Sequence, residues 1–309
     1  MPRSTFAMFA AFVVIALIAA CAPTAATSQP SPSNLQVVAV ETFLADIAQN
    51  VAGERVHVQV LMPLGVDAHA FEPTPQDVKK VADSDVFIVN GAGFEGFLDK
   101  LLENAGGTRL YIEASKGLVS RERKADEPHA EDTVGDPHFW FDPTKTIRYV
   151  ENIRDGLTQA DPAGAATYKS NADAYIQKLN ALDANIKDQV NAIPSANRKL
   201  VTDHDTFGYF ADRYGFQIVG MIVPSVSTAD STSAQNLAEL IQAIQATGAK
   251  AIFLEVNANP QVAEQIARET GARIVTGLYT HSVSEPNGPA PTYIQMLEYD
   301  TRKIVDALQ

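Results

Sequence analysis

The alternation of short apolar runs with amphipathic stretches predicts an α/β protein. β-branched runs occupy residues 35–41, 55–62 and 86–91, and helical patterns separate them. The pattern restarts after residue 192 with apolar runs at 199–204, 217–223, 251–256 and 273–278. Such alternation is typical of parallel strands joined by crossover helices. We therefore predict two similar α/β domains, each a mostly parallel sheet flanked by helices.

A long amphipathic stretch lies between the two predicted sheets. Apolar side chains recur at spacings of three and four from Tyr168 to Val190, which predicts a single helix. Asp161 before Pro162 is typical of a helix start, and Pro194 of a helix end. At 1.5 Å per residue such a helix spans about 45 Å, so we expect one long rigid helix to join the domains. The predicted boundaries are 35–160 for the N-terminal domain, 161–193 for the linking helix and 194–309 for the C-terminal domain.

The first 34 residues are predicted to lie outside the fold. Residues 1–20 carry one charge, Arg3, followed by an uninterrupted apolar run, which is the pattern of an export signal peptide. The run ends at Cys21, the only cysteine of the chain, in a sequence that resembles the bacterial lipobox. Two outcomes are open: a lipid anchor on Cys21, which we favour, or ordinary cleavage that releases a soluble protein. Residues 21–34 are small, polar and Pro-rich, and are predicted to form a flexible tether.

The charge balance narrows the range of partners. The chain has 24 Lys and Arg against 37 Asp and Glu, a formal net charge of −13. This acidic balance argues against nucleic acid and against an anionic membrane surface as partners, and it favours a cationic ligand. No GxxxxGK[ST], GxGxxG or HExxH motif is present, so phosphate binding, dinucleotide binding and the zinc-protease motif have no support.

Four of the six histidines stand at comparable places, just after predicted strands or just before a helix: His69, His138, His204 and His281. Loops at the carboxyl ends of parallel strands form the ligand crevice of open α/β sheets, so these loops can converge between two domains. Four imidazoles would make a tetrahedral site, which suits Zn²⁺. A loop histidine is more often solvated or hydrogen-bonded than bound to metal, so spacing alone leaves the choice open.

The residues around these histidines carry a family resemblance. Residues 65–77 (GVDAHAFEPTPQD), 136–143 (DPHFWFDP), 202–210 (TDHDTFGYF) and 251–255 (AIFLE) resemble motifs of the zinc/manganese solute-binding proteins of bacterial metal ABC importers. The resemblance covers essentially the whole mature chain. It implies one transported Zn²⁺ per chain, an ABC transporter permease and a periplasmic zinc chaperone as partners, and no enzymatic activity. It also implies a monomer in the periplasm or on the extracytoplasmic face of the membrane.

The resemblance assigns metal ligands residue by residue. The family's three histidine ligands match His69, His138 and His204, and manganese-specific members tend to have a carboxylate at the third position, so His204 favours zinc. The fourth family ligand is usually an Asp, and this chain has His281 there. Either His281 binds the metal directly, which we favour, or it turns away and water or Glu285 completes the site.

A site of four neutral imidazoles leaves the charge of the ion to be offset by acidic side chains behind the ligands. The candidates are Glu255, Asp205 and Glu72, with Glu255 the first choice because it ends a predicted strand. Trp140, beside His138, is expected to pack around the site.

The two remaining histidines carry weaker signals. His57 alternates with valines, and we interpret it as an ordinary strand residue. His129 lies in the acidic loop 121–136, for which a mobile solvated loop and an accessory metal site are both open.

Three functions follow from these observations. The favoured one is capture of Zn²⁺ outside the cytoplasmic membrane and its delivery to a permease. The second is the same scaffold with Mn²⁺ or Fe²⁺ as cargo, against which the histidines at the third and fourth positions argue. The third is a zinc hydrolase, which would need three protein ligands and an open water position.

Overall fold

The computed structural model describes Met1 and residues 33–122 and 135–309. The predicted signal peptide, Cys21, nearly all of the tether and His129 lie outside the described residues. Among the helices that are described, none combines the length and the apolar character needed to cross a membrane.

Two parallel four-stranded sheets form the framework and confirm the predicted fold class. The first sheet has the order β2-β1-β3-β4 and consists of β1 (Val37–Ala39), β2 (Val58–Val60), β3 (Val86–Val89) and β4 (Leu110–Glu113). The second has the order β6-β5-β7-β8 and consists of β5 (Lys199–Thr202), β6 (Gln217–Met221), β7 (Ala251–Glu255) and β8 (Arg273–Leu278). The strand order is the same in both halves. In each, the chain reverses direction across the sheet after its second strand, which opens a crevice at the carboxyl edge.

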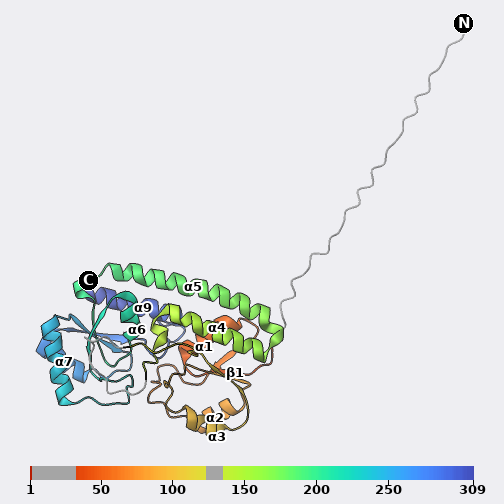
Figure 1. Cartoon of the computed structure of the whole chain (residues 1–309), viewed down its shortest axis with the longest axis horizontal. Helices are drawn as coiled ribbons and strands as arrows, with labels where there is room; N and C mark the ends of the chain where they lie inside the picture. Colours follow the sequence, from red (N-terminus) through yellow and green to blue (C-terminus); the bar gives the residue numbers. More distant parts are fainter. Residues whose placement is uncertain (2–32, 123–134) are drawn as a thin grey trace.

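Helices flank both sheets, and one long helix runs beside both halves (Figure 1). The described helices are α1 (Thr42–Ala52), α2 (Pro75–Ala82), α3 (Leu98–Ala105), α4 (Pro143–Ala160), α5 (Ala165–Asn191), α6 (Gly208–Tyr214), α7 (Ala234–Thr247), α8 (Gln261–Thr270) and α9 (Tyr293–Leu308). α5 packs against α1, α4 and α9. One apolar cluster runs from the first sheet through these helices to Leu200 and Phe253 of the second, so the two halves share a core.

The sequence analysis did not predict the fourth strand of the first sheet. β4 is an edge strand that pairs only with β3, and only Ile112 of its four residues is buried. This edge strand gives an apolar run of only three residues, at 110–112, because one face and one edge meet solvent. The other strands lie inside the predicted runs and are shorter or equal in length. His57 lies one residue before β2 and is exposed, so its assignment to a strand was wrong.

The linking helix is confirmed as a single element, but its predicted start was wrong. α5 begins at Ala165, after a short 3-10 turn at Pro162–Gly164, and its 27 residues span about 40 Å. Asp161 makes no side-chain cap. Its carboxylate instead accepts hydrogen bonds from Arg55 Nη2 at 2.8 Å and from the Tyr168 hydroxyl at 2.6 Å. This ion pair ties the start of the helix to the loop before β2.

A second buried carboxylate ties α5 to the C-terminal half. Asp183 accepts hydrogen bonds from Arg213 Nε at 2.9 Å and Nη2 at 2.8 Å, and from the Tyr214 hydroxyl at 3.2 Å. Burial alone would raise the pKa of Asp183, but the bonds from Arg213 and Lys187 lower it to about 2. One charged contact just before α5 thus ties the chain to the N-terminal half, and another on α5 ties the helix to the C-terminal half.

We predict that Asp183→Asn lowers the free energy of unfolding by about 2 kcal/mol at pH 7, because hydrogen bonds to charged partners contribute on this scale. A depressed folded-state pKa stabilises the fold above the unfolded pKa of about 4, and this contribution is lost as the pH falls through about 2. Urea unfolding at pH 7 and at pH 2.5 measures both effects. Asp173→Asn is the control, because Asp173 pairs with Lys169 on the same helix with 55% of its side chain exposed. An equal loss in both variants would contradict the assignment.

Candidate metal centre

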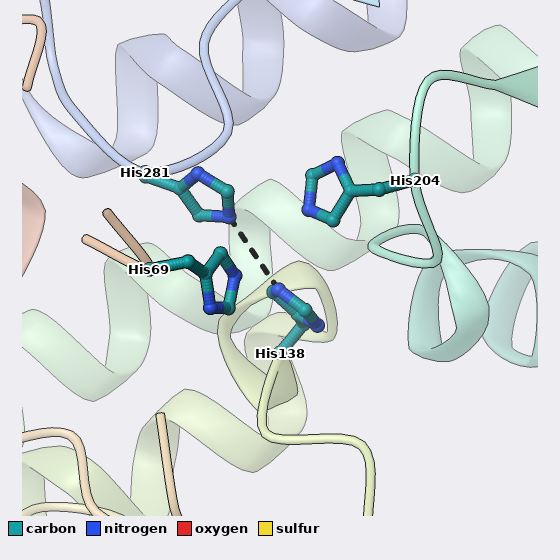
Figure 2. A group of neighbouring side chains, drawn as sticks. All are labelled: His69, His138, His204 and His281. Atoms are coloured by element: carbon teal, nitrogen blue, oxygen red, sulfur yellow. Dashed lines mark hydrogen bonds between the residues drawn. The ribbon is translucent and has the colours of Figure 1, made fainter. Parts of the chain in front are cut away.

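The four histidines singled out from the sequence meet between the two halves (Figure 2). His69 lies in the loop between β2 and α2, and His138 stands directly before the 3-10 turn Phe139–Phe141 that leads into α4. His204 follows β5, and His281 follows β8. Two ligand loops thus come from each half of the chain, and three of the four leave the carboxyl end of a strand. The expected convergence of these loops is present in the structure.

The spacing of the rings fits one small cation. All pairs of imidazole centroids among the four lie 4.9 to 5.8 Å apart. The Nε2 atoms of His138 and His281 are 3.4 Å apart and face each other in Figure 2. With Zn–N bonds of about 2.0–2.1 Å, two nitrogens of a tetrahedral site are about 3.4 Å apart.

Two of the inward nitrogens have no hydrogen-bond partner among the described residues. His138, His204 and His281 are buried, and His69 is half-buried. Among the described residues, the Nε2 atoms of His69 and His204 are buried without a hydrogen-bond partner. Burial of an unpaired polar atom costs about 1–3 kcal/mol, and a cation at the common centre would give these nitrogens a partner. The residues therefore fit a metal ion.

Carboxylates stand behind the imidazoles, on the side away from the centre. Asp136 Oδ1 lies 3.0 Å from His138 Nδ1, and Asp203 Oδ1 lies 3.4 Å from His204 Nδ1. The Glu255 carboxylate lies 3.3 Å from His281 Nδ1 and 3.8 Å from His204 Nδ1. Asp136 is within hydrogen-bond distance of His138 Nδ1, an arrangement that keeps the proton on Nδ1 and aims Nε2 at the metal. The longer approaches of Asp203 and Glu255 to His204 and His281 act through charge.

Glu255 occupies the position that the sequence analysis preferred, whereas Glu72 does not. Glu72 is exposed and lines a separate pocket with Phe71 and Phe97, so its proposed role beside the histidines was wrong. Asp205 is buried, its backbone N–H donates to the Ser225 carbonyl, and its role stays a prediction.

Asp136 and Asp203 were missed, although a signal was present. Each stands one or two residues before a histidine, as Asp67 does before His69. Asp67 Oδ1 accepts the His69 backbone N–H at 3.0 Å and lies 3.7 Å from His281 Nδ1. An acidic residue directly upstream of each of these three histidines was the available pattern.

Burial and charge set the protonation of the imidazoles. Burial and the neighbouring imidazoles lower the pKa of His69 to about 2 and hold the pKa of His138 well below its ordinary value. Burial also acts against protonation of His204, but Asp203 and Glu255 outweigh it and raise the pKa of His204 to about 9. Because Asp203 and Glu255 favour the protonated form of His204, a cation that binds this imidazole has to displace its proton.

Buried hydrogen bonds hold the ligand loops in place. The indole N–H of Trp140 donates to the Thr280 carbonyl at 3.0 Å, next to His281, and its ring centroid lies 5.1 Å from that of His138. The predicted packing of Trp140 around the site is thus confirmed. Ser282 Oγ accepts bonds from the Gly65 N–H at 2.9 Å and from the Thr42 hydroxyl at 3.1 Å. These bonds join loops from both halves of the chain.

The structure also bears on the alternative that water or Glu285 completes the site. His281 points into the group, whereas Glu285 is exposed. The geometry therefore matches the favoured arrangement, in which His281 is the fourth imidazole.

Two parallel α/β halves, a long linking helix and a buried histidine site between the halves define a helix-linked solute-binding protein for a metal ion. Residues 37–307 match the family model described as zinc-uptake complex component A, periplasmic. The chain belongs to this family of periplasmic metal-binding proteins of ABC transporters.

Relatives in this family carry different metal names. The chain is 33% identical to the manganese-binding lipoprotein MntA of Halalkalibacterium halodurans over 275 residues, which cover 89% of this chain and 88% of that one. It is 32% identical to the iron-binding protein YfeA of Yersinia pestis, with 95% and 94% of the two chains covered.

Solved structures share the fold. The Mn-bound periplasmic metal binding protein from Candidatus Liberibacter asiaticus is 30% identical with a TM-score of 0.78, covering 88% of this chain and 99% of that one. The periplasmic zinc binding protein TroA from Treponema pallidum is 28% identical with a TM-score of 0.78, covering 88% and 98%.

We predict that Glu255→Gln weakens metal binding 10- to 100-fold, because loss of a carboxylate behind a ligand imidazole has effects of this size. The same change removes the charge that faces both His281 and His204. Competition with a chromophoric chelator measures the affinity. Glu285→Gln is the control. It changes an exposed carboxylate in the loop that follows His281, and it should bind metal like the wild type. Equal affinity of the Glu255→Gln variant and the control would refute the role of Glu255.

Proposed function

We propose that this protein captures Zn²⁺ between its two halves and delivers it to an ABC transporter permease for import. The observation that carries the proposal is the donor set: the four side chains that face one centre are all histidines. Zn²⁺ accepts four nitrogen donors in a tetrahedron, whereas Mn²⁺ and Fe²⁺ sites usually add carboxylate or water oxygen at higher coordination numbers. The carboxylates of this site lie at the outer nitrogens instead.

The second candidate keeps the scaffold and changes the cargo to Mn²⁺ or Fe²⁺. The names of relatives support it, since one is a manganese-binding lipoprotein and another an iron-binding protein. The donor set of this chain favours zinc over this alternative, because His204 and His281 supply nitrogen at both positions where the resemblance leads us to expect carboxylates in manganese-binding members.

Binding for transport, rather than catalysis, is the role that this arrangement supports. A catalytic zinc usually keeps three protein ligands and an open position for water. Here four imidazoles surround the centre, and the Phe94 ring packs against three of them. A zinc hydrolase is therefore the least supported of the three functions.

The remaining proposals concern location and partners. Several relatives are named lipoproteins, which supports a lipid anchor at Cys21 and a place in the periplasm or on the extracytoplasmic face of the membrane. The permease is the required partner, and a periplasmic zinc chaperone and a monomeric state complete the proposal. The net charge of −13 attracts cations from the surroundings. The division of the chain at 35–160, 161–193 and 194–309 also stays a prediction, although the α-helix of the linking segment begins only at Ala165.

Zinc should stabilise the protein through the four histidines. At a thousandfold excess over Kd, a ligand that binds only the folded state stabilises it by about 4 kcal/mol. We predict that His138→Ala and His204→Ala each lose most of this stabilisation in thermal melting of the chain from Ala22 onward. His57→Ala, at an exposed position before β2, should keep it. Zinc-dependent melting that persists in both site variants would contradict the assignment.

The cargo preference should depend on His281. We predict that His281→Asp reduces the preference for Zn²⁺ over Mn²⁺ by at least tenfold, because a carboxylate supplies the oxygen donor that Mn²⁺ prefers. Parallel competition titrations with both metals give the ratio, and His281→Gln, which introduces no negative charge, is the matched control. If the wild type itself prefers Mn²⁺, the zinc proposal is wrong and the second candidate replaces it.

A further inference from the structure

Phe94 lies against the histidine site, although no sequence motif drew attention to it. Its ring centroid is 4.9 Å from that of His69, 5.7 Å from His138 and 5.5 Å from His281. The ring is buried, and its centroid lies 4.9 Å from that of Trp140, which also neighbours His138 and His281. Phe94 thus contacts three of the four imidazoles.

The backbone that presents Phe94 is strained and clamped. The three residues before it all have positive φ: Gly91 at 84°, Ala92 at 54° and Gly93 at 79°. Positive φ is unfavourable for a residue with a Cβ atom, so Ala92 holds a conformation that costs of order 1 kcal/mol or more. The Glu95 carboxylate accepts the backbone N–H groups of Asn90 at 2.5 Å and Gly91 at 3.0 Å, which holds this turn. Strain that is held this firmly points to a functional role.

The position of the Phe94 ring relative to His204 shows which face of the ligand tetrahedron the ring covers. Among the described residues, Phe94 has ring contacts with His69, His138 and His281 but none with His204. In a tetrahedron of four imidazoles, Phe94 therefore lies over the face opposite His204. A fifth ligand has to enter through a face of the tetrahedron, and this face is the one covered by an apolar ring.

A pocket lies beside the site, and both Phe94 and His69 line it. This pocket of about 160 Å³ is lined by His69, Gly93, Phe94, Pro137, Val226 and Ser227. A water molecule that approached the metal past Phe94 would face an aromatic ring, which offers no strong hydrogen-bond acceptor, so its binding would be disfavoured.

We propose that Phe94 is a specificity-determining residue that keeps the bound metal four-coordinate and thereby selects Zn²⁺ against cations that require additional water ligands. The inference rests on the proposed function, since it assumes that the four histidines hold the ion. Exclusion of a fifth and a sixth ligand lowers the binding affinity for Mn²⁺ and Fe²⁺ more than that for Zn²⁺, because Mn²⁺ and Fe²⁺ favour higher coordination numbers with oxygen donors. The donor atoms and the covered face then act together on the choice of metal.

The test compares Phe94→Leu and Phe94→Ala with Phe97→Leu. Phe97 is the next aromatic residue of the same segment, and it packs on Phe71 at 5.0 Å in a different pocket. Competition titrations give the preference for Zn²⁺ over Mn²⁺, and Co²⁺ loaded in place of zinc reports coordination through its visible absorption, which is intense for four ligands and weak for six. We expect the two Phe94 variants to lose at least tenfold of the zinc preference and to show weakened cobalt bands. Phe97→Leu should match the wild type in both.

Each other outcome overturns the inference. Phe94 does not set the selectivity if its variants keep the zinc preference and the intense cobalt bands. The same conclusion holds if Phe97→Leu alters the zinc preference and the cobalt bands as much as the Phe94 variants do. The wild-type cobalt spectrum decides the question even if the variants fail to fold, because weak bands of a six-coordinate ion contradict a closed face. Failure of the proposed function is recognised separately: wild-type protein would then bind no zinc, or would bind it unchanged after His138→Ala.

Discussion

The convergence of four imidazole nitrogens from loops of two different sheets is the constraint on which the rest of this structure depends. These nitrogens satisfy one another only in part: the Nε2 atoms of His138 and His281 are within hydrogen-bond distance, whereas those of His69 and His204 have no partner among the described residues. A cation at the centre would give all four nitrogens a partner. The elements around the site keep the loops in position without it: Trp140 bonds to the carbonyl before His281, and Ser282 bonds to Gly65 and Thr42. Asp161, just before α5, pairs with Arg55 of the first half, and Asp183 of α5 pairs with Arg213 of the second.

Charge is arranged in layers around this centre. The inner layer consists of imidazoles, and the outer layer of carboxylates at Nδ1 of His138, His204 and His281. The outer layer compensates a divalent cation without contributing oxygen donors, which is the arrangement expected for selective binding of a nitrogen-preferring metal. At the position of His281 the family resemblance leads us to expect an Asp, which would place a negative charge in the inner layer. Here the negative charge nearest to this position is that of Glu255 in the outer layer, which faces both His281 and His204.

The sequence predicted the parts of this molecule that follow from local patterns. Strand runs and helix periodicity gave the fold class and the long helix, and the positions of His69, His204 and His281 after strands implied that they would meet. What it could not predict depends on tertiary contacts. β4 is an edge strand with one buried residue, and its apolar run of three residues was too short to mark it. Asp161 stood where a helix cap is expected, but Arg55, 106 residues earlier, binds its carboxylate. Phe94 is one apolar residue among many until the strained turn before it is seen to aim it at three histidines.

The most direct test of the account is X-ray absorption at the zinc edge of the zinc-loaded protein from Ala22 onward. It measures the number, type and distance of the atoms bound to the ion in solution. The account predicts four nitrogen ligands at about 2.0–2.1 Å, with the multiple-scattering pattern of imidazole and no additional oxygen. A five- or six-ligand shell, or a carboxylate or water oxygen in place of one imidazole, would contradict the four-histidine site.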